Sequence, residues 1–470
     1  MTVLETSDQT RFDHARDALA HTVSPRTWRR AFDLGRADAT IAPALRVGLA
    51  TAVVLVVGAL LGYRELAGFA ALGALASAFG RYEPYPRLAG KLALVGAVLV
   101  ASIGFGGILG AVGLPVWLLI AVLSLLAGAA SAYMNAFQLI GPGPVIPVFA
   151  ATGAAGFSAT VGDAVAVTTA AAAGVLVGWA AAMLPGLLLP LGPARLAAAR
   201  AFEVVGTLED RDGVVEARRA VDRAREVLAA SGRSRSGSRH GRDLAELLDA
   251  ADSAVDAWVV DGNSDAVQDI ARHGRELRRI RRSGVIGGVG DRPSPATELP
   301  VPVGLLRTAR VNLRGPTLRH TVIRVMVASA LSGWLAAACG LEHPLWASLG
   351  AIAALQGLNY AHTVQRGIQR LLGNIGGAAV AAGLLAASLG FWQAVAAVVV
   401  LQIAAELMVL VNYGLTTLVV TPMALLMTGF TTPVTAGTGV SRIADTLVGV
   451  VIGVLVAAVT VSRADRHHTA

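Results

Sequence analysis

Two long stretches of this 470-residue chain are almost free of charged side chains. Residues 47–194 contain four Lys or Arg and three Asp or Glu, and residues 317–470 contain seven and four. Residues 195–316, between them, contain 21 basic and 18 acidic side chains. Because one Arg or Asp at the centre of a bilayer costs roughly 2.5–3.5 kcal/mol, this middle segment cannot lie in hydrocarbon. The order along the chain is therefore membrane, water, membrane.

The apolar content agrees with this order. Hydrophobic residues make up 54% of the chain and charged residues 15%, whereas soluble proteins average about 45–50% and 25%. A spanning helix needs about 20 apolar residues, and each block divides into six apolar runs. The sequence predicts an all-α integral membrane protein with twelve transmembrane helices. The runs lie at about 44–62, 66–80, 88–110, 114–133, 137–157, 163–188, 321–339, 344–358, 368–389, 391–411, 413–430 and 440–461.

The two blocks resemble each other in the order of their landmarks. Arg46 and Arg324 open the first run of each block, and Asn135 in the first block corresponds to Asn412 in the second. The second run of each block has only about 15 residues, roughly 22 Å of helix. With six runs per block and both blocks starting on the same side, the sequence predicts two parallel six-helix repeats.

The short loops indicate the orientation. Basic residues gather in the loops on the side of the N-terminus, so the positive-inside rule places both termini and the middle segment in the cytoplasm. The N-terminus does not fit a secretory signal, because several arginines precede the first apolar run. The loop residues that carry this inference are Arg81, Arg87, Lys91, Arg366 and Arg370.

From residue 193 to 316 the pattern changes to amphipathic helix. One apolar face is formed by Leu244, Leu247, Leu248, Ala251, Val255 and Trp258. This spacing predicts a cytoplasmic helical insert between the repeats. The predicted domains are a cytoplasmic N-terminal segment at 1–40, the first membrane repeat at 41–192, the helical domain at 193–316, the second repeat at 317–462 and a cytoplasmic tail at 463–470.

Several classes of function are disfavoured. Cys339 is the only cysteine, so neither an internal disulfide nor a cysteine metal site is expected. The net charge of +8 is spread along the chain, which argues against a nucleic-acid partner. No metal-ligand spacing, nucleophile motif or phosphate-binding loop occurs, so we expect no cofactor, no metal and no enzymatic activity.

Polar groups inside the predicted spans are the functional candidates, because hydrocarbon cannot solvate them. Glu406 is the only carboxylate near the middle of a predicted run. It is either a proton-carrying group in a transport cycle or a packing residue, neutral or paired with Arg324. Arg366 and Arg370 share one helical face and are suited to collect an organic anion, or they only set the orientation. The same alternatives apply to Arg46 and Arg324.

Helix breaks fall at matching places in the two blocks. Pro142, Pro144 and Pro147 interrupt the fifth run, and Pro422 interrupts the eleventh. Interrupted segments at matching positions predict a binding site near the membrane midplane, although a packing kink is the alternative. The polar residues just before the breaks are candidates to hydrogen-bond a solute: Asn135, Gln138, Asn412 and Tyr413.

The second block resembles the fusaric acid resistance family, to which aromatic acid exporters belong. The resemblance rests on the stretches His343–Ala347, Gln365–Asn374, Asn412–Tyr413 and Arg442–Gly449. It covers about 320–461 well and 44–190 more weakly. The motif positions that it implies are Pro344, Trp346, Arg366, Arg370, Gly373, Asn412, Arg442 and Asp445.

This resemblance implies an inner-membrane efflux protein for aromatic or other organic acids, driven by the proton gradient. Its partners would be a small organic anion and the lipid bilayer, and a homodimer is compatible with the sequence but not required by it. Two alternatives stay open. One is an organic-anion channel, and the other is a membrane scaffold whose cytoplasmic domain binds a protein partner.

Overall fold

The computed structural model describes residues 11–35, 37–262, 264–278, 299–357, 359–429 and 436–461. All regular structure in these residues is helical. The chain divides into two compact units. The membrane unit comprises residues 1–79, 92–182 and 308–470, and the helical unit comprises residues 80–91 and 183–307. The predicted tail at 463–470 lies outside the described residues, and the other predicted domain boundaries stay predictions.

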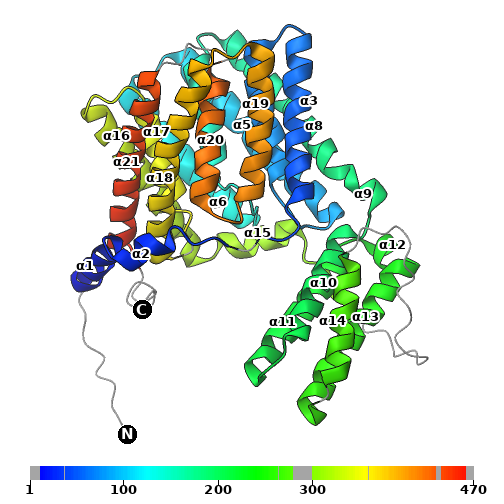
Figure 1. The fold of residues 1–470 in the computed structure, drawn as a ribbon. Helices are drawn as coiled ribbons and strands as arrows, with labels where there is room; N and C mark the ends of the chain where they lie inside the picture. The colour runs from blue at the N-terminus through cyan, green and yellow to red at the C-terminus, as the bar shows by residue number, and fades with distance from the viewer. Residues whose placement is uncertain are drawn as a thin grey trace. The chain divides into compact units, whose positions relative to one another are not determined.

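A helix lies at the place of each predicted apolar run (Figure 1). The first block contains α3 (Ile41–Leu60), α4 (Arg64–Ala74) with the 3₁₀ turn η1 (Leu75–Ala78), α5 (Tyr85–Val112), α6 (Val116–Ala136), α7 (Val145–Phe157) and α8 (Val161–Met183). The second block contains α16 (Pro316–Ala338), α17 (Pro344–Ala354), α18 (Tyr360–Ala386), α19 (Phe391–Met408), α20 (Tyr413–Thr428) and α21 (Ala436–Val459).

Eight of the described helices are long and apolar enough to cross a membrane. The protein is thus a multi-pass membrane protein, and the count of twelve spans stays a prediction. The other four helices of the blocks are short, with 11 residues in α4 and α17, 13 in α7 and 16 in α20. At 1.5 Å per residue an 11-residue helix extends about 17 Å, too little for a core of about 30 Å.

The short helices lie inside the membrane unit and make close backbone contacts there. In α17 every residue from Ala347 to Ala354 is buried. A Cβ atom built on Gly174 of α8 would lie 1.9 Å from the carbonyl oxygen of Ala70 in α4. A Cβ atom on Gly449 of α21 would lie 2.2 Å from the carbonyl oxygen of Ala347 in α17. The second and sixth helices of each block therefore pack together through glycine, as small residues allow in membranes.

The two blocks also contact each other in a reciprocal way. The first helix of the first block, α3, packs against α19, and the first helix of the second block, α16, packs against α6. At these contacts Gly48 faces Ile403, and Gly128 faces Met326. Each block thus places its first helix against the fourth helix of the other.

Two helices precede the first block, α1 (Arg11–Thr22) and α2 (Pro25–Arg30). They pack against α18 and α21, and Figure 1 shows them at the end of the bundle where α18 begins and α21 finishes. A short helix, α15 (Leu305–Leu313), precedes the second block and leads into α16. The Asn312 side chain of α15 donates a hydrogen bond to the carbonyl oxygen of Ala136 at the end of α6, at 2.9 Å.

Between residues 183 and 278, the described part of the helical unit contains four longer helices and two short ones. They are α9 (Pro185–Leu188), α10 (Gly192–Gly206), α11 (Arg211–Ala229), α12 (Arg233–Ser236), α13 (Arg239–Asp261) and α14 (Ser264–Leu277). The apolar face predicted on 244–258 lies on α13, where Leu244, Leu248 and Val255 are at most 1% exposed. Its core partners include Phe202 of α10, which is fully buried.

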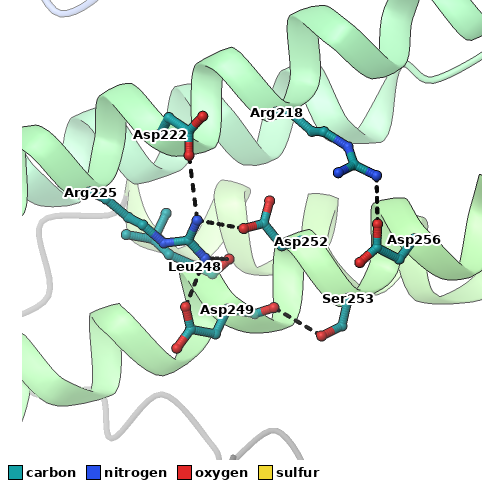
Figure 2. A network of polar contacts seen from close by, with 8 residues as sticks. All are labelled: Arg218, Asp222, Arg225, Leu248, Asp249, Asp252, Ser253 and Asp256. Carbon is teal, nitrogen blue, oxygen red and sulfur yellow. Dashed lines mark hydrogen bonds and ion pairs between the residues drawn. The ribbon is translucent and has the colours of Figure 1, made fainter. Parts of the chain in front are cut away.

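An ion-pair network joins α11 to α13 inside the helical unit (Figure 2). Arg225 contacts Asp249 at 2.7 Å and Asp252 at 2.5 Å, and its side chain is 12% exposed. Burial lowers the pKa of Arg225, but its hydrogen bonds and charge attraction to Asp252 and Asp249 outweigh burial, so this pKa lies above its ordinary value. The guanidinium therefore stays charged and neutralises two neighbouring carboxylates.

We expect Arg225→Gln to destabilise the helical unit by about 2 kcal/mol, between the values typical of exposed and buried ion pairs. The reason is that the change leaves Asp249 and Asp252 facing each other without a cation. Hydrogen exchange of α11 and α13 in the full-length protein measures the effect. The matched control is Arg218→Gln, since the Arg218–Asp256 pair is more than half exposed and is expected to contribute less than about 1 kcal/mol. Equal effects of the two variants would contradict this interpretation.

Candidate binding cavity in the membrane unit

A cavity of about 710 Å³ lies inside the membrane unit, and residues of both blocks line it. From the first block the predicted residues Asn135, Gln138, Pro142 and Pro144 line it, and the second block contributes most of the charged groups. Its lining includes these polar and aromatic residues of the second block: Trp346, Gln356, Arg366, Arg370, Asn374, Gln402, Glu406, Tyr413, Thr417, Thr421, Arg442 and Thr446.

Two arginines of α18 converge on one tyrosine at a wall of the cavity. The guanidinium of Arg366 lies 3.9 Å from the ring centre of Tyr413, and Arg370 donates a hydrogen bond to the Tyr413 hydroxyl at 3.0 Å. The spacing of four residues places both arginines on one face of α18, as predicted. Arg366 is further held by the carbonyl oxygen of Ala353 and the side chain of Gln356, whereas Nε of Arg370 has no hydrogen-bond partner among the described residues.

The tyrosine is fixed by the start of α20. Asn412 is the N-cap of this helix, and its side-chain oxygen accepts hydrogen bonds from the backbone N–H groups of Gly414 and Leu415. A Cβ atom on Gly373 would lie 2.5 Å from the carbonyl oxygen of Gly414, so this glycine lets α18 approach α20 closely. The cap and the close contact together set where Tyr413 meets the two arginines.

A third arginine lines the same cavity from α21. The guanidinium of Arg442 lies 4.7 Å from the ring centre of Trp346 on α17, and the His343 ring stacks on Trp346 with 4.3 Å between centroids. Arg442 is 9% exposed, and its Nε has no hydrogen-bond partner among the described residues. The cavity therefore combines the guanidinium groups of Arg366, Arg370 and Arg442 with the aromatic rings of Tyr413 and Trp346.

Buried polar groups link the helices behind these arginines. Asn374 of α18 donates to Thr446 of α21 at 2.5 Å and accepts from Thr421 of α20 at 2.6 Å. Asp445 is fully buried; one of its carboxylate oxygens accepts from Ser441 at 3.4 Å, and the other has no hydrogen-bond partner among the described residues. Sequence analysis missed Asn374 as a site residue, although an amide in an apolar run is a usable signal.

Glu406 lines the cavity from α19 and is 7% exposed. Gln402, one turn earlier on the same helix, lines it too and is 4% exposed. Sequence analysis did not name Gln402 as a candidate. A carboxyl group with so little access to water can exchange a proton only through the cavity, which is the arrangement that a proton-carrying group requires.

Other predicted residues lie elsewhere. Arg46 donates a hydrogen bond to the carbonyl oxygen of Phe79 at 3.2 Å, and neither Arg46 nor Arg324 is among the lining residues. Pro147 is the third residue of α7 and Pro422 lies inside α20; both are buried and outside the lining. Pro344 is the first residue of α17.

A second, more open cavity of about 460 Å³ adjoins the first. The two cavities share Gln356, Gly357, Arg366, Val409 and Tyr413 in their linings. Asp33, Leu34 and Gly35 line the second cavity. They belong to residues 31–35, which follow α2 and are here called the N-terminal strap. Sequence analysis did not predict this contact.

Side-chain amides hold the strap in place. Gln369 and Asn412 each donate to the carbonyl oxygen of Ala31, at 2.9 and 3.0 Å, and Asn412 also donates to that of Asp33 at 3.0 Å. The backbone N–H of Gly35 donates to the carbonyl oxygen of Val411 at 2.8 Å. Asn412 therefore caps α20 and binds the strap at the same time.

Comparisons with known proteins agree with the resemblance seen in the sequence. Residues 329–456 match a family model described as fusaric acid resistance protein-like. A Bacillus subtilis (strain 168) protein named uncharacterized membrane protein YvaC is 25% identical over 455 residues, covering 88% of this chain and 71% of the relative. No solved structure matches. The matched region runs from within α16 to within α21 and contains all three cavity arginines. The second block of this multi-pass membrane protein is therefore similar, over residues 329–456, to the family described as fusaric acid resistance protein-like.

Proposed function

We propose that this protein is a transporter, rather than an enzyme, that exports aromatic or other organic acids across the inner membrane of the cell. The observation that carries the proposal is the cavity of about 710 Å³ inside the membrane unit, lined by Arg366, Arg370 and Arg442 together with Glu406. Three arginines and one carboxyl group leave an excess of positive charge in surroundings that are otherwise mostly apolar.

An organic anion is the solute that fits this chemistry. Guanidinium groups bind carboxylates through paired, charge-assisted hydrogen bonds. Arg370 and Arg442 both line the cavity, so their guanidinium groups are placed to donate to a solute inside it. The rings of Tyr413 and Trp346 lie beside these arginines and offer flat apolar faces to an organic group. A bound carboxylate would also offset the cost of holding the arginines in a membrane interior.

The duplicated arrangement supports alternating access. The reciprocal contacts of α3 with α19 and of α16 with α6, and the short second and fifth helix of each block, are what two parallel six-helix repeats would produce. In this proposal the repeats rearrange around the cavity, and each rearrangement exposes it to one side of the membrane. Both termini and the helical unit are then cytoplasmic.

Proton coupling is assigned to Glu406. Its carboxyl group is nearly buried in the lining of the cavity, where the arginines favour its charged form and the low dielectric favours its neutral form. A bound anion weakens the effect of the arginines on Glu406, and release of the anion restores it. A proton would therefore bind when the anion binds and dissociate when the anion leaves.

Uptake into proteoliposomes tests this function. The purified full-length chain is reconstituted, and the accumulation of a panel of labelled aromatic acids is measured with and without a pH gradient. We expect at least one acid to accumulate against its own gradient, and only when the pH gradient is present. Anion currents that persist without a pH gradient would instead establish a channel. A protein that moves none of the acids in either condition would favour a scaffold.

A further inference from the structure

We propose that the surface formed by residues 23–35, which comprise Val23, Ser24, α2 and the N-terminal strap, binds anionic lipid headgroups, because it joins exposed apolar side chains to a cluster of arginines at the end of the helix bundle. The inference does not depend on transport. It concerns a segment that the proposed function does not use, and it assigns that segment a partner.

One side of this segment is bound to the membrane unit. Side-chain amides of the membrane unit donate hydrogen bonds to backbone carbonyl oxygens of this segment. Gln365 donates to Arg30, and Gln369 donates to Ala31. Asn412 donates to both Ala31 and Asp33. A Cβ atom on Gly35 would lie 3.0 Å from the carbonyl oxygen of Leu410, so only a glycine fits here without displacement. The backbone thus faces the bundle, and most of the side chains are left to face outward.

The outward side chains are apolar to an unusual degree. Val23 is 76% exposed, Trp28 40%, Phe32 66% and Leu34 67%. Four large apolar side chains within twelve residues of sequence are costly to expose to water. The segment lies at the end of a bundle of membrane helices (Figure 1). Interfacial segments at such an end insert apolar side chains into the headgroup region of the bilayer.

The positive charge of the segment favours lipids with anionic headgroups. Arg26, Arg29 and Arg30 are exposed, and Asp33 is the only acidic residue between residues 23 and 35. Each basic residue near an anionic leaflet contributes about 1 kcal/mol of attraction. A second copy of this chain would bring the same positive charge to the contact, so anionic lipid fits this surface better than self-association does.

Lipid binding has a structural consequence for the second cavity. Asp33, Leu34 and Gly35 line that cavity opposite Arg366 and Tyr413. Lipid that holds Phe32 and Leu34 in the interface would also hold the strap over the cavity. The strap is thus attached on one side by the amides of α18 and Asn412, and on the other by the membrane surface.

Fluorescence quenching tests the proposal in the full-length chain. Val23→Cys is made in a Cys339→Ser background and labelled with an environment-sensitive dye. The protein is reconstituted in vesicles of phosphatidylcholine alone, or with increasing phosphatidylglycerol, that contain a headgroup-level quenching lipid. We expect quenching to increase with the phosphatidylglycerol content and to fall when salt is raised, because salt screens attraction at the surface.

Charge variants give the decisive comparison. Replacing Arg26, Arg29 and Arg30 together with Gln is expected to weaken lipid binding of the segment about a hundredfold and to reduce quenching to the level in phosphatidylcholine. The control replaces Arg219, Arg223 and Arg242 with Gln, which removes the same charge from exposed positions in the helical unit, and should leave quenching unchanged. The proposal would be overturned by quenching that changes with neither the phosphatidylglycerol content nor the salt concentration. A dye that lipid does not quench at all would also overturn it, and would indicate a protein partner.

Discussion

Arg370→Gln is expected to raise the KM for the exported acid by about ten- to a hundredfold, with little effect on folding. The change removes a hydrogen bond to a charged group, which contributes about 1.5–3 kcal/mol, and each 1.4 kcal/mol is tenfold in affinity. Arg370 lines the cavity and donates to the Tyr413 hydroxyl, so in the proposed function the anion loses a direct ligand. Initial rates of uptake into proteoliposomes, measured over a range of acid concentrations, give KM.

Two control variants separate anion binding from general damage. Arg370→Lys keeps the positive charge but lacks the planar fork of donors, so we expect a smaller rise in KM than with Gln. Arg219→Gln removes an exposed arginine in the helical unit and should leave KM unchanged. A KM that stays the same in Arg370→Gln, in protein that reconstitutes normally, would remove Arg370 from the anion site.

Glu406→Gln is expected to abolish the dependence of transport on the pH gradient while anion binding is retained. With one proton moved together with each anion and the membrane voltage held at zero, a gradient of two pH units supports up to about a hundredfold accumulation. Gln cannot carry a proton, so the variant should equilibrate the acid without accumulating it. The accumulation ratio at steady state measures the loss.

The alternative role of Glu406 predicts a different result. If this side chain only packs α19 against its neighbours, Gln preserves its hydrogen-bonding shape and the accumulation ratio should stay near that of the parent. Gln402→Glu in the Glu406→Gln background moves the carboxyl group one helical turn along the cavity wall. Partial recovery of accumulation in this double variant would support a proton-carrying role, whereas recovery of protein yield alone would not.

The positions of the membrane helices could be predicted because a spanning helix appears in the sequence as a run of apolar residues. The lengths of these helices were harder to predict. The short second helix of each block was visible in the sequence, but the fifth run was predicted over 137–157 and its helix starts only at Val145. Pro142 and Pro144 indicated a break in this run, but hydropathy did not show where the helix begins, since it does not distinguish a helix from an apolar loop that is buried in protein.

The arginine pair of α18 could be predicted because residues four apart lie on one face of a helix. The contact of Arg366 and Arg370 with Tyr413 could not be predicted, nor could the presence of Arg442 in the same cavity. The reason is that these contacts join α18 to α20 and α21 through tertiary packing. Arg46 illustrates the opposite case. Its position in the sequence matches that of Arg324, yet the structure places its guanidinium on the carbonyl oxygen of Phe79, at the end of the 3₁₀ turn that follows α4.

No sequence pattern predicted the position of the N-terminal strap. Its carbonyl oxygens, not its side chains, are bound by Gln369 and Asn412, and backbone groups are the same in every residue type. Asn412 was singled out in the sequence as a solute ligand, but in the structure its amide is engaged with the strap and with the start of α20. It is a lining residue of the second cavity and not of the first.

The most direct test of the transport proposal is an experimental structure of the full-length chain in lipid nanodiscs, determined with an exported acid bound. We expect the acid inside the cavity of about 710 Å³, with its carboxylate within hydrogen-bonding distance of Arg370 or Arg442 and its organic group beside Tyr413 or Trp346. An acid bound outside the membrane unit, or a cavity filled by lipid chains while the acid is bound elsewhere, would contradict the proposal.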